Sequence, residues 1–468
     1  MKSFDLIVIG SGPAGQRGAI QAAKFGKRVA LIEKETVFGG ACIHTGTLPS
    51  KALRESIYNI YTFRLGGTEL TRRAVREKVS FKELSARKDK VISNENEIIS
   101  NAIRSNGISV YQGFGSFIDP THVRIQTSEG GEIVIEGKYF LIATGSRPVR
   151  PAQIPFDDQI VCDSDSILNM AEIPESLTVI GGGVIGCEYA SMFSALGVDV
   201  HLVDKKSDIL PFMDQEITEV LKKSLISQGC RLNLGDEFVT IAKTSDGKVE
   251  TTLKSGRKIK STNLLYAMGR GPQTDKLNLK AAGVKTDDRG HILVNKNYVS
   301  DAPHIYAVGD VIGFPSLASS GFEQGRLAIC HALNIPHGEF PDEFPYGIYT
   351  IPEISSVGKT EEELIASKTE YEVGRSEYLE TARGQIIADS VGLLKICFCP
   401  KTHKIYGIHI IGNSASELIH LGQMVMRLGG DMRTLIRNIF NYPTLAEAYK
   451  IAAFNGLNKT FKDQEIRY

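Results

Sequence analysis

Two segments of the chain repeat one arrangement of glycines, 171 residues apart. The repeated glycines are Gly10, Gly12 and Gly15 in the first segment and Gly181, Gly183 and Gly186 in the second. In such a spacing the first glycine permits a tight turn, the second lets the backbone approach a pyrophosphate, and the third lets a helix pack closely on a strand. In both copies an acid, Glu33 or Asp204, follows the first glycine by 23 residues and can accept hydrogen bonds from a ribose diol. The repeat therefore predicts two dinucleotide-binding sites.

The residues around each copy predict the elements that position these glycines. Each copy follows a short apolar strand, opens a helix, and leads to a second strand that ends in the acid. The N-terminus of the helix offers free N–H groups and a positive dipole end to the phosphates. Three further apolar strands end in short turns, which are Thr144-Gly145, Gly269-Arg270 and Gly309-Asp310. A helical segment that contains Ala318 follows the last of these turns.

The remaining sequence indicates one more domain. Residues 108–139 alternate apolar and polar residues around Gly and Asp-Pro turns, which is typical of a small β-meander. Beyond about residue 341 the glycine fingerprints stop, and strands alternate with amphipathic helices, including a helix-patterned stretch over 417–427. The expected fold class is therefore α/β, with two Rossmann-like dinucleotide-binding domains and a C-terminal α+β domain.

The composition is that of a globular protein without a strong net charge. Lys plus Arg and Asp plus Glu number 54 each, so we expect no partner that is recruited by overall charge, such as nucleic acid or an anionic membrane. No apolar run reaches the roughly 20 residues that cross a bilayer. The basic stretch from Arg72 to Lys78 also contains acidic and apolar residues, and we expect it to form the exposed face of a helix.

Seven cysteines are scattered along the chain, and this odd number favours a reducing compartment, which we expect to be the cytoplasm. Cys397 and Cys399 alternate as they would along a strand, so both should point to one face. We interpret them as two buried thiols and not as metal ligands. No metal site is predicted.

The order of these elements resembles, over the whole chain, the flavoprotein family of dihydrolipoamide dehydrogenase, glutathione reductase and mercuric reductase. Residues 39–51, Gly-Gly-Ala-Cys-Ile-His-Thr-Gly-Thr-Leu-Pro-Ser-Lys, are similar to the redox-disulfide loop of that family. Residues 441–447, Asn-Tyr-Pro-Thr-Leu-Ala-Glu, are similar to its His-Pro-Thr segment. The single-cysteine loop and the Tyr-Pro-Thr segment resemble the branch of the family that exchanges hydride between nicotinamide nucleotides.

The resemblance implies a division of the chain and its cofactors. It implies a FAD-binding domain in two segments, 1–150 and 273–340, that encloses an NAD(P)-binding domain over 151–272. The C-terminal domain over 341–468 is implied to form a two-fold homodimer that completes each flavin pocket.

The resemblance also implies roles for single residues. Glu33 would bind the adenosine ribose of FAD, and Asp310 would hold the ribityl chain. Lys51 and Glu188 would pair near flavin N5, where a cation favours the reduced flavin and the carboxylate keeps the lysine charged. The other residues implied to contact the nucleotides are Lys34, Gly40, Cys42, Thr47, Thr144, Gly145, Gly269, Arg270, Gly309 and Ala318.

The chain departs from the family pattern at two positions. Cys42 aligns with one thiol of the redox disulfide, but Thr47 stands where the second belongs, and a hydroxyl cannot complete a disulfide. Tyr442 stands where the family has an acid–base histidine, near Glu447 at the predicted entry of the partner subunit. We interpret Cys42 as a structural or vestigial thiol in preference to a redox centre. His44 is expected to bond to backbone or to pack in preference to shuttling protons, and Tyr442 is expected to pack.

These departures leave the flavin as the one evident carrier of two electrons. The chemistry implied is transfer of a hydride from NADPH to NAD+ through FAD, with one nicotinamide site used in turn. An alternative is an NAD(P)H dehydrogenase that reduces a quinone or another small acceptor, and a non-enzymatic flavoprotein is a third reading. Asp204 suits the ribose 2′-hydroxyl of NAD and repels a 2′-phosphate, whereas Lys205 and Lys206 can offset that repulsion.

Overall fold

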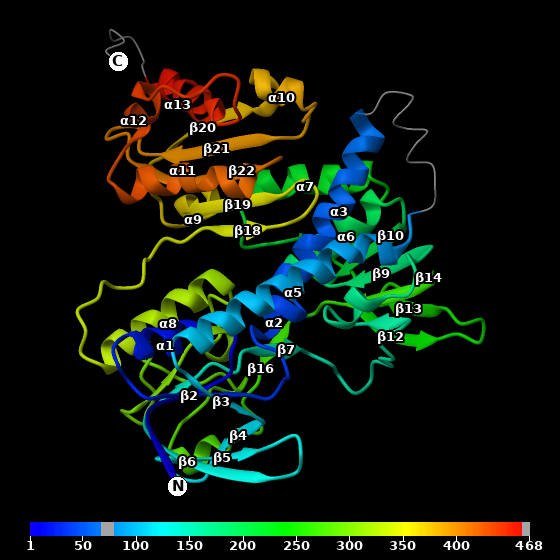
Figure 1. Cartoon of the computed structure of the whole chain (residues 1–468). Coiled ribbons are helices and arrows are strands. Elements are labelled where there is room, and N and C mark those ends of the chain that lie inside the picture. Colours follow the sequence, from blue (N-terminus) through cyan, green and yellow to red (C-terminus); the bar gives the residue numbers. More distant parts are fainter. Residues whose placement is uncertain (67–78, 461–468) are drawn as a thin grey trace.

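The computed structural model describes residues 1–66 and 79–460, so the basic stretch 72–78 lies outside the described residues. Three units follow, each built on one main sheet (Figure 1). The first unit lies at the N-terminal end of the molecule and the C-terminal unit lies opposite it, with the second unit beside both.

The first unit contains a seven-stranded sheet. Its parallel strands have the order β3-β2-β1-β6-β17, and β5 and β4 add an antiparallel extension to the start of β6. The strands are β1 (Lys2–Ile9), β2 (Val29–Glu33), β3 (Ser109–Gln112), β4 (Phe114–Phe117), β5 (His122–Gln126), β6 (Glu132–Ile142) and β17 (Ile305–Ala307). The predicted meander is confirmed for β4 to β6, whereas β3 pairs in parallel with β2.

Helices cover one face of this sheet. α1 (Pro13–Lys24) and α8 (Ala318–Ala332) lie side by side there, because small residues allow their backbones to approach (Figure 1). A Cβ added at Gly325 of α8 would come within 2.1 Å of the carbonyl oxygen of Ala14. Two short 3-10 helices, η2 (Leu279–Ala282) and η3 (Gly309–Ile312), lie before and after β17 in the chain.

The second unit contains a five-stranded parallel sheet of order β11-β10-β9-β15-β8. Its strands are β8 (Val161–Cys162), β9 (Ser176–Ile180), β10 (Asp199–Asp204), β11 (Arg231–Leu234) and β15 (Asn263–Tyr266). The helices are α6 (Val184–Ala195), α7 (Gln215–Ser227) and the 3-10 helix η1 (Ser166–Asn169). A separate antiparallel sheet contains β12 (Phe238–Lys243), β13 (Val249–Leu253) and β14 (Lys258–Ser261). Both units therefore have the predicted strand–helix–strand repeat.

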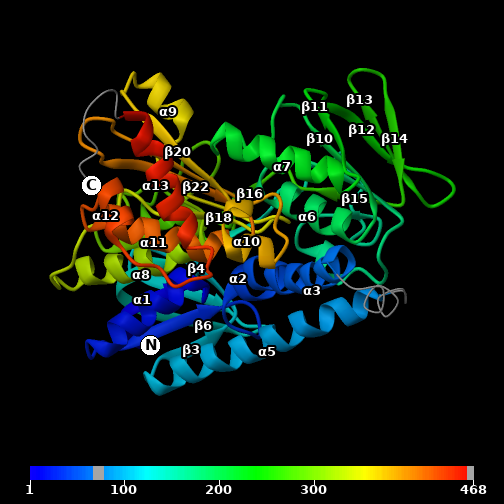
Figure 2. The same ribbon diagram turned by 90° about the horizontal axis from the view of Figure 1, so that it is seen from above.

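Two connections join the first and second units. β7 (Ser146–Pro148) and β16 (Arg270–Pro272) form an antiparallel pair where the chain enters and leaves the second unit. α3 (Thr47–Gly66) and α5 (Phe81–Ser105) run side by side, as Figure 2 shows from above. Leu53 and Ile57 of α3 are buried in the same core as Tyr189 of α6, so that α3 fixes the second unit against the first.

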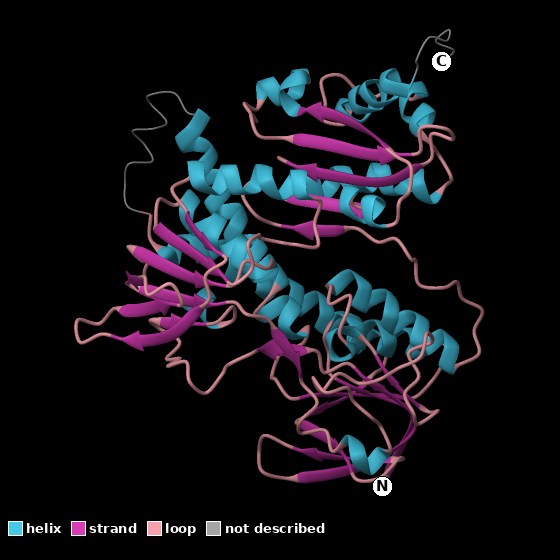
Figure 3. Cartoon of the chain, turned by 180° about the vertical axis from the view of Figure 1, so that it is seen from behind, coloured by secondary structure: helices cyan, strands magenta, loops and turns pink. Residues whose placement is uncertain are grey.

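The C-terminal unit contains an antiparallel sheet of order β18-β19-β22-β21-β20. Figure 3 shows this sheet from behind, with its strands in magenta. Its strands are β18 (Tyr346–Ile348), β19 (Ile354–Gly358), β20 (Glu372–Glu377), β21 (Leu393–Phe398) and β22 (Ile405–Ile411). Its helices are α9 (Glu361–Ala366), η4 (Tyr378–Glu380), α10 (Ala382–Ile386), α11 (Ala415–Arg427), α12 (Met432–Arg437) and α13 (Glu447–Thr460). The helix predicted over 417–427 is confirmed as α11. Residues of α11, α12 and α13 share one apolar core with alternate residues of β21 and β22.

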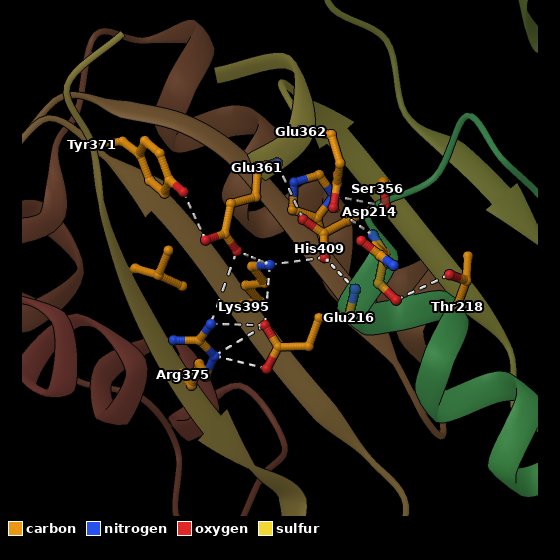
Figure 4. Close-up of polar contacts among 12 residues, drawn as sticks. Asp214, Glu216, Thr218, Ser356, Glu361, Glu362, Tyr371, Arg375, Lys395 and His409 are labelled. Carbon is orange, nitrogen blue, oxygen red and sulfur yellow. Dashed lines mark hydrogen bonds and ion pairs between the residues drawn. The ribbon is translucent and has the colours of Figure 1, made fainter. Parts of the chain in front are cut away.

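The opposite face of this sheet meets the second unit through buried charges. Lys395 of β21 is 1% exposed, and its Nζ lies 2.9 Å from Asp214, 3.0 Å from Glu216 and 2.5 Å from Glu361 (Figure 4). Asp214 is the N-cap of α7 and is fully buried. We call these four side chains the Lys395 cluster. It joins a helix of the second unit to the C-terminal sheet.

The prediction that Cys397 and Cys399 are two buried thiols on one strand is wrong. Cys397 is buried on β21, but the strand ends at Phe398, and Cys399 lies half-buried in the following turn. They are therefore not two buried thiols of one strand. None of the seven cysteines, all of which lie in the described ranges, forms a disulfide.

Candidate active site

The first glycine turn has the geometry that a dinucleotide requires. Gly10 has φ of +101°, and a Cβ there would lie 2.4 Å from the carbonyl oxygen of Ala143. A Cβ at Gly15 would lie 1.9 Å from the carbonyl oxygen of Gly10. At Gly12, the N-cap of α1, a Cβ would meet no described atom within 4 Å apart from its neighbours in the chain. This open approach to a helix N-terminus fits a pyrophosphate.

The second glycine turn repeats these constraints. A Cβ at Gly181 would lie 2.7 Å from the carbonyl oxygen of Ala267, and one at Gly186 would lie 1.8 Å from that of Gly181. Gly183 again has open space, within the described residues, at the N-cap of α6. The structure therefore contains two turns that fit dinucleotides, as the repeat predicts.

Each acidic residue is tied to its own glycine turn. Glu33 is 7% exposed and accepts hydrogen bonds from the N–H and hydroxyl of Ser11, at 2.9 and 2.6 Å. Asp204 accepts from the N–H groups of Gly182 and Lys206, at 2.5 and 2.7 Å. These bonds fix the carboxylates at the strand ends, where spare lone pairs can accept from a ribose. The motif did not identify Ser11, because its position between the glycines is variable in the pattern.

The three turns predicted at strand ends are linked through Ser146, which directly follows the first of them, and through Gln273. Asp310 accepts a hydrogen bond from the hydroxyl of Ser146 at 2.7 Å, and Arg270 donates to that hydroxyl at 3.0 Å. Thr144 donates through its hydroxyl to the carbonyl oxygen of Gln273 at 2.8 Å. Lys34 donates to the amide oxygen of the same Gln273 at 3.1 Å. The predicted residues near the β7–β16 pair are thus brought together.

Lys51 and Glu188, 137 residues apart, form the predicted pair. Lys51 Nζ lies 2.8 and 2.7 Å from the two carboxylate oxygens of Glu188. The side chain of Glu188 is 5% exposed and that of Lys51 is 26% exposed, so the pair is open on the side of the lysine. Lys51 lies in the second turn of α3, and Glu188 lies in the second turn of α6. A buried carboxylate beside a partly open ammonium can present a fixed positive charge to a ligand.

The segment with the single cysteine lies beside this pair. Cys42 belongs to α2 (Gly40–His44), and burial raises the pKa of its thiol, whereas a hydrogen bond with Thr47 acts in the opposite direction. His44 Nε2 bonds to the carbonyl oxygen of Phe38 at 2.7 Å, which confirms the predicted backbone contact. A raised pKa keeps Cys42 protonated at neutral pH and favours a structural thiol.

Tyr442 was expected to pack, but its side chain is exposed in the structure. Its side chain is 75% exposed, so it does not pack within this chain. Glu447 is half-buried as the first residue of α13. Among the described residues, neither of them makes a hydrogen bond or ion pair with Lys51 or Glu188.

One group of side chains has the spacing of a metal site. Ligand atoms of Asp214, Cys397 and His409 lie within 4.8 Å of one another. However, Lys395 Nζ already lies 2.9 Å from Asp214, and His409 bonds through Nδ1 to Ser356 and through Nε2 to a carbonyl oxygen. Burial also raises the pKa of the Cys397 thiol to about 12. A metal ion would therefore face a cation, an engaged imidazole and a protonated thiol.

Comparison with known proteins adds independent findings. The model of the pyridine nucleotide-disulphide oxidoreductases matches residues 4–325, and the model of their dimerisation domain matches residues 344–453. The soluble pyridine nucleotide transhydrogenase of Mycobacterium bovis is 44% identical over 462 residues and 98% of each chain. The protein of the same name from a Marinomonas species is 43% identical over 465 residues, with 98% of this chain and 99% of the relative covered.

One solved structure has a fold similar to that of this chain. LpdA from Mycobacterium tuberculosis has a TM-score of 0.89 and 25% identity, covering 97% of this chain and 99% of that one. The predicted fold class, with two Rossmann-like units and a C-terminal dimerisation domain, is confirmed. Among the described residues, no helix has both the length and the apolar character that crossing a membrane requires. The chain belongs to the pyridine nucleotide-disulphide oxidoreductase family.

Proposed function

We propose that this protein is a FAD-dependent transhydrogenase that transfers hydride from NADPH to NAD+ and yields NADP+ and NADH. The observation that carries the proposal is the combination of two dinucleotide turns with one Lys51–Glu188 pair, while Thr47 replaces the second sulfur of a redox disulfide. The relatives named soluble pyridine nucleotide transhydrogenase, which match nearly the whole chain, support it.

The first glycine turn is the proposed FAD site. Gly12 leaves room for the pyrophosphate at the N-terminus of α1, and Glu33 is fixed by Ser11 at the position of the adenosine ribose. Asp310 is held by Ser146 and would accept a hydrogen bond from the ribityl chain. When bound, FAD would accept a hydride from one nicotinamide and return it to another.

Lys51 and Glu188 would serve this chemistry by electrostatics and position. The bidentate contact orients the lysine, and the 5% exposure of Glu188 limits competition from water for the ion pair. A positive charge held beside the flavin ring would favour the electron-rich form of the cofactor. The pair would contribute orientation and charge, and neither residue would need to exchange a proton.

The second glycine turn would receive the two nicotinamide nucleotides in turn. Asp204 is held at the end of β10 by two backbone N–H groups, where it suits a ribose 2′-hydroxyl. Lys205 and Lys206 are exposed directly after it and would offset its repulsion of a 2′-phosphate. Charge of both signs at this position is compatible with the use of both nucleotides.

We also propose that the protein acts as a homodimer in the cytoplasm. The matched dimerisation domain over residues 344–453 supports self-association. Seven free cysteines support a reducing compartment. The proposed partners are then the nicotinamide nucleotides and a second copy of the chain, without nucleic acid or membrane.

The two half-reactions test the proposed activity under anaerobic conditions in a stopped-flow instrument. NADPH should bleach the bound flavin, and an NAD analogue should restore its colour while the reduced analogue forms without oxygen or quinone. Lys51→Met should slow both half-reactions by about tenfold or more. Lys82→Met removes an exposed lysine of α5 and is the matched control. If excess NAD+ leaves the flavin bleached and a quinone discharges it rapidly, the protein is instead an NAD(P)H dehydrogenase.

A further inference from the structure

A side chain of the C-terminal unit contacts the Lys51–Glu188 pair. Tyr349 directly follows β18, and its backbone N–H donates to Oε1 of Glu188 at 2.9 Å. Lys51 Nζ lies over the ring of Tyr349, 5.0 Å from the ring centroid. Tyr349 therefore contacts both members of the pair, the carboxylate through its backbone and the ammonium through its ring.

The backbone around Tyr349 is fixed to both helices that carry the pair. The N–H of Ile351 donates to the hydroxyl of Ser191 on α6 at 3.1 Å. Arg54 of α3, which is 7% exposed, donates to the carbonyl oxygen of Thr350 at 3.2 Å. Thr350 and Ile351 are almost fully buried. The ring of Tyr349 is thus held by a buried segment that is pinned to α3 and α6.

We propose that Tyr349 is a positioning residue for Lys51. Its ring holds the lysine ammonium in a position that the carboxylate of Glu188 alone would not fix. This inference rests on the proposed function, because it assumes that the charge of Lys51 serves the flavin. A lysine has a flexible four-carbon side chain, so one carboxylate fixes its charge less well than a carboxylate and an aromatic face together. The attraction comes from the ring quadrupole, so a phenylalanine would keep it, although it would lose the hydrogen bond between the hydroxyl and Ser416.

Three variants separate the ring from its packing. Tyr349→Phe keeps the aromatic face, and Tyr349→Leu removes it. Replacement of Tyr349 by 3,4,5-trifluorophenylalanine keeps the shape of the ring but weakens its attraction for a cation. Phe156→Leu is the matched control, because it removes the ring that Arg150 lies over, 5.0 Å from the ring centroid, in a part of the chain that does not hold the Tyr349 segment.

Two measurements read out the position of Lys51 and do not depend on turnover. In the full-length protein, the midpoint potential of the bound flavin should become more negative with trifluorophenylalanine and with leucine, and should stay at the wild-type value with phenylalanine. In protein stripped of flavin, acylation of Lys51, followed by peptide mass spectrometry, should be about threefold to tenfold faster in Tyr349→Leu. Phe156→Leu should change neither quantity.

Flavin reduction by NADPH completes the test. Among the three replacements of Tyr349, the reduction rate should be highest with phenylalanine, lower with trifluorophenylalanine and lowest with leucine. Equal potentials across this series, or equal damage by Tyr349→Phe and Tyr349→Leu, would overturn the role of the ring. If Lys51→Met slows reduction while the Tyr349 series is flat, this inference fails and the proposed function stands. If Lys51→Met itself has no effect, the role proposed for the lysine fails first.

Discussion

At the scale of single residues, two thiols of this chain have opposite surroundings. Cys42 lies beside Thr47, and burial raises the pKa of its thiol. Cys399 lies half-buried in the turn after β21, where burial acts to raise its pKa but hydrogen bonds from Thr402 lower it to about 7. The cysteine in the family's redox loop is therefore the less reactive of the two, because the thiolate is the nucleophile.

We predict that iodoacetamide modifies Cys399 well before Cys42. Near pH 8, about one unit above its pKa, Cys399 is mostly thiolate, and near pH 6 its alkylation should be roughly tenfold slower. Peptide mass spectrometry over time gives both rates. Cys162, whose pKa burial raises to about 11, is the unreactive reference. Faster labelling of Cys42 than of Cys399 would contradict the assigned environments.

Site residues could be predicted from the sequence where they belong to a motif of fixed spacing or to a segment that resembles the family. Gly10, Gly12 and Glu33 follow a spacing dictated by turn geometry, and the Lys51–Glu188 contact is formed as the resemblance implies. Tyr349 could not be assigned in this way, because its contact depends on how the C-terminal unit docks between two helices. The exposure of Tyr442 was likewise not predictable, since local pattern does not reveal which surfaces remain uncovered within one chain.

At the scale of elements, β21 carries a charge in the middle of an otherwise apolar strand. Leu394 and Ile396 point into the core with α13, whereas Lys395 points to the other face, toward Asp214 at the start of α7. Strand alternation predicts the two faces, but it does not predict that both are buried. The carboxylates that accompany Lys395 come from another unit and from α9, which explains how a lysine is tolerated there.

We predict that Lys395→Met destabilises the protein by about 3–5 kcal/mol, because it leaves the fully buried Asp214 without its ammonium partner. The loss should shrink at lower pH, since protonation of Asp214 removes the unpaired charge. Lys395→Met combined with Asp214→Asn should be more stable than Lys395→Met alone. The midpoint of thermal unfolding, measured at two pH values, checks both statements, and a single variant as stable as the wild type would refute the first.

At the scale of the whole molecule, large apolar side chains remain uncovered on the C-terminal unit. Leu428, Ile439 and Tyr442 are 79%, 95% and 75% exposed. These residues lie within the segment matched by the dimerisation-domain model. Exposed apolar side chains of this size favour association, and a two-fold dimer would bury the same surface on both copies.

We predict that Ile439→Asp converts the homodimer to a monomer at micromolar concentration, because it places a charge on a surface that the dimer would bury. Light scattering coupled to size-exclusion chromatography measures the mass. Ile226→Asp changes an isoleucine of α7 that is 58% exposed in the second unit, and it should leave the dimer intact. A dimer that survives Ile439→Asp but dissociates with Ile226→Asp would place the interface elsewhere.

The insertion of the second unit between β6 and β17 has a consequence for synthesis on the ribosome. The first sheet cannot be completed until β17 emerges, after the whole of the second unit has been translated. The second unit is continuous in the chain and can fold while it is being translated. During that time the edge of β6 that pairs with β17 has no partner strand. A nascent chain arrested just before β17 should therefore contain a protease-resistant second unit and a protease-sensitive first unit.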